Sequence, residues 1–321
     1  MRIAILGAGL AGLATAWHLL QQGGEVTLFD HKGIAGEASG IATGLAHPFP
    51  GKKALRSWQT AEGMRETEAL VRVAETALGR PVMAPQGIFR PAISPQQKSD
   101  FALRAEEDVE AEWKEIAWPH PLSGLWIPNG MTLYPRLYCG GLWRACEQRG
   151  ATLIRESIVQ IDALTGFPHI VIATGSSTLC FPACQSLPLK TNWGQTLLCR
   201  WPEPLPFSLV SQGHITPTEH PDLCLVGSTY EHTPFPDPNI AKGLLQQVAR
   251  FYPPAASFEI VEIRAGKRCA PRTGYRPLCT AVAKNLWVFT GLGSRGLLYH
   301  AWLGKMLATL ISRRENPIIT G

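Results

Sequence analysis

The first residues whose spacing could do chemistry are three glycines near the start of the chain. They form the pattern Gly-x-Gly-x-x-Gly, which comprises Gly7, Ala8, Gly9, Leu10, Ala11 and Gly12. At the first turn of a helix, unpaired backbone N–H groups and the helix dipole favour a bound phosphate. The first glycine of such a pattern allows a tight turn, the second a close approach to a pyrophosphate, and the third close helix packing. We therefore expect these six residues to bind the pyrophosphate of a dinucleotide.

An acidic residue follows the glycine pattern at the distance that a dinucleotide site requires. Asp30 follows Gly12 at close to the spacing of about 20 residues expected for a carboxylate that accepts from ribose hydroxyls. We place the neighbouring His31 in the same expected contact. Apolar runs at 2–6 and 26–29 flank a helical pattern, which gives the order strand, glycine turn, helix, strand and acid. This is the context that a dinucleotide-binding pattern requires.

Three further segments place small residues at the ends of predicted elements. Residues 38–48 form an amide-rich segment suited to wrap a pyrophosphate, and a buried strand over 170–173 ends in a glycine. A strand over 286–290 leads into a glycine-rich helix start, where the helix dipole would stabilise negative charge on a ligand. Ordinary packing glycines and a packed or surface histidine are the plainer alternatives. The expected ligand contacts here are Ala38, Ser39, Gly40, Gly44, His47, Thr174, Gly175, Gly291, Gly293, Ser294, Arg295 and Gly296.

Composition is typical of a globular enzyme. The 321 residues are 45% hydrophobic and 17% charged, with a net charge of +5 that argues weakly for an anionic partner. No apolar stretch reaches the ~18 residues that cross a bilayer. Glycines interrupt the apolar start, so we expect no signal peptide and a cytoplasmic location. The eight cysteines have no zinc-binding spacing, so we expect free thiols and no metal.

The remaining elements alternate between two kinds. Helical periodicity runs over 54–78 and 140–149, and an acidic helix is predicted over 101–116. Prolines and short β-type runs over 182–238 favour an antiparallel sheet. The predicted fold class is α/β, and α+β in part, with interleaved domains. We expect a nucleotide-binding domain from 1–80, 135–180 and 260–321, and a substrate-binding domain from 81–134 and 181–259.

Four motifs in this order resemble the FAD-dependent D-amino-acid oxidase (DAO) superfamily, which includes glycine oxidase and sarcosine oxidase. They are the first glycine pattern, Glu37-Ala38-Ser39-Gly40, Ala173-Thr174-Gly175 and residues 291–296, and the resemblance covers essentially the whole chain. It implies FAD as the cofactor, held by a Rossmann-like domain that is interleaved with an antiparallel-sheet substrate domain. It also implies an oxidoreductase that acts on CH–NH or CH–NH2 groups.

Within that superfamily the chain looks most like one branch, the oxidoreductase half of the bacterial bifunctional tRNA 5-methylaminomethyl-2-thiouridine biosynthesis protein (MnmC). The segments that carry this likeness are residues 227–230, 265–269 and 291–296, together with Ala38-Ser39-Gly40 through Gly44 to Pro48. A methyltransferase half precedes the oxidase in that branch, whereas Met1 opens directly on the flavin motif here. The likeness implies tRNA as partner, with a separate methyltransferase. The reaction would remove the carboxymethyl group of 5-carboxymethylaminomethyl(-2-thio)uridine during tRNA modification.

The resemblance also implies a role for Arg268. In glycine-oxidase-like members an arginine in a Gly-x-Arg context on a strand binds the substrate carboxylate, and Gly266-Lys267-Arg268 matches it. A planar guanidinium suits this role because it offers a fork of donors to a carboxylate. A surface arginine is the alternative. His47 is a candidate to face the flavin ring, and weaker pocket candidates, otherwise expected in an aromatic core, are Tyr134, Tyr230 and Tyr275.

Two other functions stay open. A small amino-acid substrate (glycine, sarcosine or a D-amino acid) would make the protein a free amino-acid oxidase or dehydrogenase. A flavin-binding protein without turnover is the second alternative. It arises because the strand 223–227 has no lysine of the kind that sarcosine-oxidase-like members place near the flavin.

Overall fold

A mostly parallel six-stranded sheet forms one half of the molecule. In the computed structural model, which describes residues 1–117 and 121–313, its strand order is β15-β16-β9-β1-β2-β8. Every neighbouring pair is parallel except β15 with β16. The buried apolar runs predicted near the start, the middle and the end of the sequence form its four inner strands, β16, β9, β1 and β2. The bounds are β1 Arg2–Leu6, β2 Glu25–Phe29, β8 Thr152–Ile154, β9 His169–Ile172, β15 Leu278–Ala283 and β16 Leu286–Thr290.

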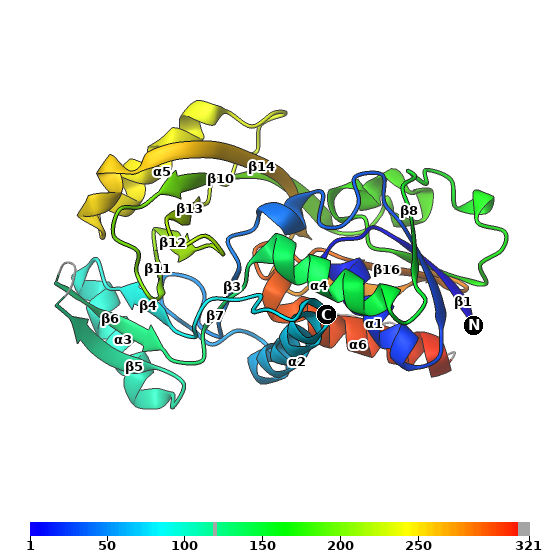
Figure 1. The fold of residues 1–321 in the computed structure, drawn as a ribbon, viewed down its shortest axis with the longest axis horizontal. Coiled ribbons are helices and arrows are strands. Elements are labelled where there is room, and N and C mark those ends of the chain that lie inside the picture. Colours follow the sequence, from blue (N-terminus) through cyan, green and yellow to red (C-terminus); the bar gives the residue numbers. More distant parts are fainter. Residues whose placement is uncertain (118–120, 314–321) are drawn as a thin grey trace.

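Helices α1 and α6 pack against strands of this sheet, and α2 and α4 pack on those helices. The largest hydrophobic core lies between them and the strands, and α1 packs against both α6 and α4 while α2 packs against α4 and α6. Figure 1 shows these helices grouped on the side of the molecule that carries β1 and β16. Their bounds are α1 Leu10–Gln21, α2 Thr60–Leu78, α4 Pro135–Glu147 and α6 Gly296–Arg313.

An eight-stranded sheet forms the other half. Its order is β14-β10-β13-β12-β11-β4-β6-β5, and only β4 with β11 is parallel among its neighbours. The long strands β10 and β14 arch over the molecule toward the first sheet (Figure 1). The bounds are β4 Ile88–Pro91, β5 Glu112–Ile116, β6 Leu122–Ile127, β10 Leu189–Arg200, β11 Ser208–Ser211, β12 Gly213–Pro217, β13 Leu223–Gly227 and β14 Glu259–Pro271.

Two helices pack on this second sheet, and short elements join the halves. Helix α5 (Pro238–Ala249) contacts β10, β12 and β13, and α3 (Pro95–Glu107) contacts β5 and β6. Strands β3 (Leu45–Ala46) and β7 (Met131–Thr132) form a small antiparallel pair. The 3-10 turns are η1 Ala38–Ile41, η2 Ile161–Ala163, η3 Gly175–Cys180, η4 Pro182–Cys184 and η5 Pro253–Ser257.

The fold class is confirmed, because distant segments build a parallel sheet with helices and a largely antiparallel second sheet. The expected boundary at residue 260 stays a prediction; β14, which begins at Glu259, pairs with β10 in the eight-stranded sheet. The other boundaries of the interleaved division stay a prediction.

The acidic helix expected over 101–116 is wrong in its second half. Helix α3 ends at Glu107, and residues 112–116 form β5, which pairs with β6. Asp108 caps the end of α3 in an extended conformation and accepts from the backbone N–H of Glu110, which turns the chain. Residues 112–116 have no period-two alternation that would mark a strand, since the half-buried Trp113 and Ile116 are three positions apart, and pairing with β6 decided the structure.

Among residues 1–117 and 121–313, no helix is long and apolar enough to cross a bilayer. The same residues contain no cluster of three or more His, Cys, Asp or Glu side chains that could hold a metal ion. All eight cysteines are free; seven are buried, and Cys180 is exposed.

Candidate active site

A cavity of about 740 Å³ is lined by residues from both sheets. Its wall includes the start of α1, the segment 38–52, strands of the eight-stranded sheet and the segment that opens α6. The predicted site residues that line it are Gly9, Leu10, Ala11, Ala38, Ser39, Gly44, His47, Gly175, Arg268, Gly291, Gly293, Ser294, Arg295 and Gly296. The structure thus gathers residues from four distant parts of the sequence.

The glycines of the first turn each meet a close neighbour. Gly7 has a φ of +108°, and a Cβ there would lie 2.4 Å from the carbonyl oxygen of Ala173. A Cβ on Gly12 would lie 1.9 Å from the carbonyl oxygen of Gly7, so the helix packs tightly on the turn. Both roles match the prediction from sequence.

Gly9 is constrained by a neighbouring side chain. A Cβ on Gly9 would lie 2.7 Å from Ser39 Oγ, and that same hydroxyl accepts a 3.1 Å hydrogen bond from the backbone N–H of Leu10. Ser39 therefore caps the start of α1, although it lies 29 residues away. Close approach of a pyrophosphate at Gly9 stays a prediction.

The carboxylate of Asp30 organises the turn. Its Oδ2 accepts from the N–H of Ala8 at 2.8 Å, and its Oδ1 accepts from the N–H groups of Lys32 and Gly33 at 2.9 and 3.0 Å. Asp30 is outside the set of cavity-lining residues, and His31 is exposed. The carboxylate keeps lone pairs for a ribose, so that expected contact stays a prediction.

The other predicted residues that do not line the cavity support its walls. Ala8 is buried, and Gly40 lies where a Cβ would approach the carbonyl oxygen of Ala35 to 2.1 Å. The hydroxyl of Thr174 lies 3.3 Å from that of Thr178, at the start of η3.

The helix start at the other end of the chain also reaches the cavity. Gly291 and Gly293 have φ values of +76° and +53°, which favour glycine, and the N–H of Gly293 donates to the carbonyl of Cys269 at 2.8 Å. Arg295 donates to Ser57 Oγ at 2.7 Å and stacks 3.8 Å from the ring centre of Tyr275. The first N–H groups of α6 consequently lie beside those of α1 in one cavity wall.

Arg268 lies on β14 with its guanidinium in the cavity wall. Its Nη1 donates to the carbonyl of Thr229 at 2.9 Å, and its guanidinium carbon lies 4.8 Å from the ring centre of Tyr230. The glycine at position 194 leaves room for it, because a Cβ there would lie 2.1 Å from the guanidinium. Burial lowers the pKa of Arg268 below its usual value, and Tyr230 opposes that shift. Arg268 forms no ion pair with an acid in the part of the chain that the structure describes.

Two histidines in the wall are held neutral. Burial, Arg90, Arg295 and His214 lower the pKa of His47 to about 3. Burial and Arg268 lower the pKa of His214 to about 3. His214 Nε2 lies 2.7 Å from Thr43 Oγ1, and His47 Nδ1 accepts from the N–H of Phe49 at 3.3 Å. Neither histidine adds positive charge to the cavity at neutral pH.

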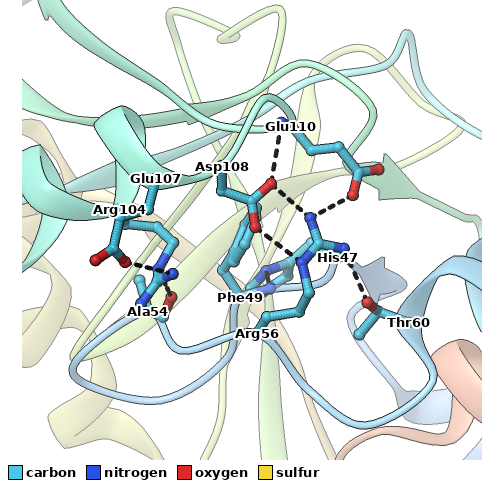
Figure 2. Close-up of polar contacts among 9 residues, drawn as sticks. All are labelled: His47, Phe49, Ala54, Arg56, Thr60, Arg104, Glu107, Asp108 and Glu110. Atoms are coloured by element: carbon cyan, nitrogen blue, oxygen red, sulfur yellow. Dashed lines mark hydrogen bonds and ion pairs between the residues drawn. The ribbon is translucent and has the colours of Figure 1, made fainter.

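Two arginines join the segment 47–60 to helix α3 and to the turn that follows it. Arg56 donates from Nε and Nη2 to Asp108 at 2.8 and 2.5 Å, and it also donates to Glu110 and Thr60 (Figure 2). Arg104 donates to the carbonyl of Ala54 at 3.0 Å and pairs with Glu107. These contacts hold one edge of the cavity, which residues 50–52 line.

Arg90 also holds the segment 47–60, through hydrogen bonds to its backbone. Its guanidinium donates to the carbonyl oxygens of Phe49 and Gly51, and it lies 5.0 Å from the ring centre of Phe101. Burial lowers its pKa to about 10.

Among the residues that the structure describes, those lining the cavity include basic side chains but no acidic ones. The lining residues include no Asp or Glu, and its cations are Lys52, Arg90, Lys267, Arg268 and Arg295. Such a lining favours anionic ligands, because positive charges in a concave, partly dry site reinforce one another.

Sequence reasoning missed several lining residues. Thr43, His214, Arg90, Gln212 and Gln247 come from strands, a loop and a helix, and no spacing marks them in the sequence. Of the tyrosines, Tyr230 lines the cavity and is exposed, Tyr275 is exposed outside the lining, and Tyr134 is half-buried outside it. The ordinary interpretation of these rings as core was therefore wrong for Tyr230, which lies in the loop between β13 and α5, and for Tyr275, which lies in the loop between β14 and β15.

The arrangement fits FAD. Glycines at both helix starts let a ligand approach backbone N–H groups, and the wall supplies positive charge for a pyrophosphate. The volume is within the range of cofactor sites. Contact of individual residues with the cofactor stays a prediction.

Comparisons with curated proteins identify two kinds of relatives. The bifunctional protein ThiO/ThiG of Nostoc sp. is 27% identical, over 99% of this chain and 54% of its own length. The bifunctional tRNA 5-methylaminomethyl-2-thiouridine biosynthesis protein MnmC of Magnetococcus marinus is 26% identical, over 98% of this chain and 57% of its own length. The chain thus spans about half the length of the curated relatives it matches.

Solved structures share the fold. Glycine oxidase from Bacillus cereus has a TM-score of 0.83 at 19% identity, covering 99% of this chain and 98% of that one. Iminodiacetate oxidase from Chelativorans sp. has a TM-score of 0.80 at 20% identity, covering 100% and 97%. Residues 2–310 match the family DAO, described as FAD dependent oxidoreductase. The chain therefore belongs to the DAO family, and it is an FAD-dependent oxidoreductase.

Proposed function

We propose that this enzyme oxidises a carbon–nitrogen bond next to a carboxylate. The observation that carries the proposal is Arg268, a largely buried cation in the cavity wall with a hydrogen bond to Thr229 and no described acidic partner. A buried charge without a counter-charge is costly. A substrate carboxylate would supply the missing negative charge. It would also accept hydrogen bonds from the guanidinium N–H groups of Arg268 that do not donate to Thr229.

The charge of the cavity favours the reactive form of an amine. Five cations line it and both wall histidines are neutral, so a bound amine is pushed toward its uncharged form. FAD, when bound, supplies the hydride acceptor. An uncharged amine has the lone pair that forms the C=N bond as hydride leaves the neighbouring carbon, so no side-chain base is needed for that step. Water then hydrolyses the imine.

The substrate class that we prefer is an N-alkylglycine group on tRNA, the carboxymethylaminomethyl group of a modified uridine. The relatives named MnmC support it, one of them over 98% of this chain. The cationic lining adds support, since nucleic acid binding depends on cations near phosphates. Oxidation would release glyoxylate and leave an aminomethyl group, which a separate methyltransferase could then methylate.

A free amino acid is the second candidate. A small amino acid would place its carboxylate on Arg268 in the same way, inside the same cavity.

Product analysis separates the two candidates. The enzyme is incubated with tRNA that bears the carboxymethylaminomethyl group, and in parallel with glycine, sarcosine and D-alanine. Mass spectrometry of nucleosides from the tRNA should show conversion to the aminomethyl form, with one glyoxylate for each group lost. Unchanged tRNA together with oxidation of a free amino acid would refute the tRNA substrate and support the second candidate.

A further inference from the structure

Tyr230 occupies an unusual position at the cavity. It lines the cavity, yet 61% of its surface is exposed, and its ring centre lies 4.8 Å from the guanidinium carbon of Arg268. A large ring that lies beside a cavity and is mostly open to solvent contributes little to the core. It is available to a ligand.

The backbone on both sides of this exposed ring is held by a buried polar network. Thr229 and Glu231 are 7% and 5% exposed. Glu231 Oε1 accepts from Gln195 Nε2 at 2.7 Å and from the hydroxyl of Thr229 at 2.5 Å, and Glu231 Oε2 accepts from the N–H of Asp237 at 2.9 Å. Burial favours a higher pKa for Glu231, but these hydrogen bonds together hold its pKa below the usual value.

The network also reaches β10 and β14. The N–H of Thr229 donates to the carbonyl of Gln195 at 3.1 Å, and Arg268 donates to the carbonyl of Thr229. The ring of Tyr230 is therefore presented on a fixed backbone, next to the group expected to hold the carboxylate. Such preorganisation lowers the entropy cost of binding.

From this placement we propose that Tyr230 is a specificity-determining residue that stacks on the pyrimidine base of a nucleoside substrate while Arg268 holds its carboxylate. The proposal rests on the proposed function and names the part of the tRNA that the site recognises. Four single bonds of about 1.5 Å separate the carboxyl carbon of a carboxymethylaminomethyl group from the base. A base whose arm is bound at Arg268 is thus within reach of the neighbouring ring. Stacking on tyrosine tolerates any flat base and is a common means of binding unpaired nucleotides.

The test compares three substrates that share the carboxymethylamino group. They are the modified tRNA, the nucleoside 5-carboxymethylaminomethyluridine, and N-ethylglycine, which lacks the base. Anaerobic stopped-flow reduction of the flavin gives an apparent Kd and a limiting rate for each. Tyr230→Leu should raise the apparent Kd for the nucleoside at least about tenfold. Its Kd for N-ethylglycine should change much less than its Kd for the nucleoside, because N-ethylglycine has no base to stack.

Two further variants sharpen the result. Tyr230→Phe keeps the ring and should bind the nucleoside within about twofold of the wild type. Phe235→Leu removes another ring of the same loop, which is 79% exposed and outside the lining, and should change nothing. A binding experiment by calorimetry with the nucleoside 5-aminomethyluridine, which has no carboxylate, should show the same loss in Tyr230→Leu without any turnover.

The outcomes separate this proposal from the proposed function. If the wild type is reduced by the tRNA and the nucleoside while Tyr230→Leu binds both as the wild type does, stacking is overturned and the proposed function stands. If Tyr230→Leu impairs N-ethylglycine as much as the nucleoside, or Tyr230→Phe loses binding tenfold, the ring does not recognise a base. A wild type reduced only by substrates without a base would overturn the stacking and the tRNA substrate, while oxidation of a carbon–nitrogen bond next to a carboxylate would stand.

Discussion

The hydroxyl of Thr43 lies 2.7 Å from Nε2 of His214, which joins the segment expected to bind the cofactor to strand β12 of the eight-stranded sheet. The pair is 171 residues apart in sequence and lies in the wall of the cavity. Because burial and Arg268 keep His214 neutral, this hydrogen bond holds the two halves together without adding charge.

Buried neutral histidines should make the protein sensitive to mild acid. The pKa values of His18, His47, His214 and His300 are lowered from 6.5 to about 4, 3, 3 and 3, mainly by burial. Below pH 6.5 the unfolded chain takes up protons that the folded chain does not, so stability falls as pH falls. Each histidine contributes a slope that approaches about 1.4 kcal/mol per pH unit.

Urea unfolding between pH 7 and pH 5 measures this slope. The window lies above the ordinary pKa values of the carboxylates whose pKa the fold lowers, such as Glu66 and Asp108, so their protonation does not obscure it. His214→Asn should reduce the slope of the unfolding free energy against pH by the contribution of one histidine. An unfolding free energy that is constant from pH 7 to pH 5 would contradict the buried neutral state.

A pair of variants at Gly9 and Ser39 tests whether Gly9 is needed to avoid a clash with Ser39 or to let the pyrophosphate approach. Gly9→Ala should destabilise the fold by about 1–3 kcal/mol, because its Cβ would lie 2.7 Å from Ser39 Oγ. Adding Ser39→Ala removes that oxygen and leaves the two Cβ atoms 3.6 Å apart, an ordinary contact. The double variant should therefore regain most of the stability, measured by urea unfolding, but still lose FAD.

The control is Ser39→Ala alone, which keeps Gly9 and measures what is lost with the cap on Leu10 and with the expected contact between Ser39 and the cofactor. FAD content is measured by absorbance after acid release. Full FAD content in the double variant would show that the pyrophosphate does not approach Gly9.

Asp30→Ala should weaken both the fold and FAD binding. It removes the acceptor of three backbone N–H groups, including that of buried Ala8, and such a loss costs about 1–3 kcal/mol. Asp30→Asn keeps one acceptor and should be intermediate. Unfolding of the apoprotein and FAD affinity are measured separately. An unchanged FAD affinity in both variants would contradict the predicted contact between Asp30 and the ribose.

The sequence was sufficient to predict the parts of the site that depend on backbone conformation. Gly7, Gly291 and Gly293 need positive φ angles, and Gly12 needs a missing Cβ, so each leaves a glycine that can be recognised without a structure. The short parallel strands were equally visible, because buried strands appear as continuous apolar runs.

Contacts between distant side chains could not be predicted. Nothing near Thr43 indicates His214, and nothing near Ser39 indicates that it would cap α1. The exposed ring of Tyr230 depends on a network from Gln195 to Asp237 that only the folded sheet assembles. In the same way, residues 112–116 resemble a helix by composition and become a strand because β6 lies beside them.

The central claim is that Arg268 binds a substrate carboxylate, and anaerobic reduction of the flavin by substrate tests it most directly. Arg268→Ala should keep its fold and FAD yet lose at least about 30-fold in the second-order rate of reduction, since removing one partner of a buried charge pair costs ~2 kcal/mol or more. Arg268→Lys should recover only part of that rate, because an ammonium lacks the planar fork. Arg264 lies on the same strand but outside the cavity lining, so the flavin of Arg264→Ala should be reduced at the wild-type rate. Reduction of Arg268→Ala at the wild-type rate would contradict the account.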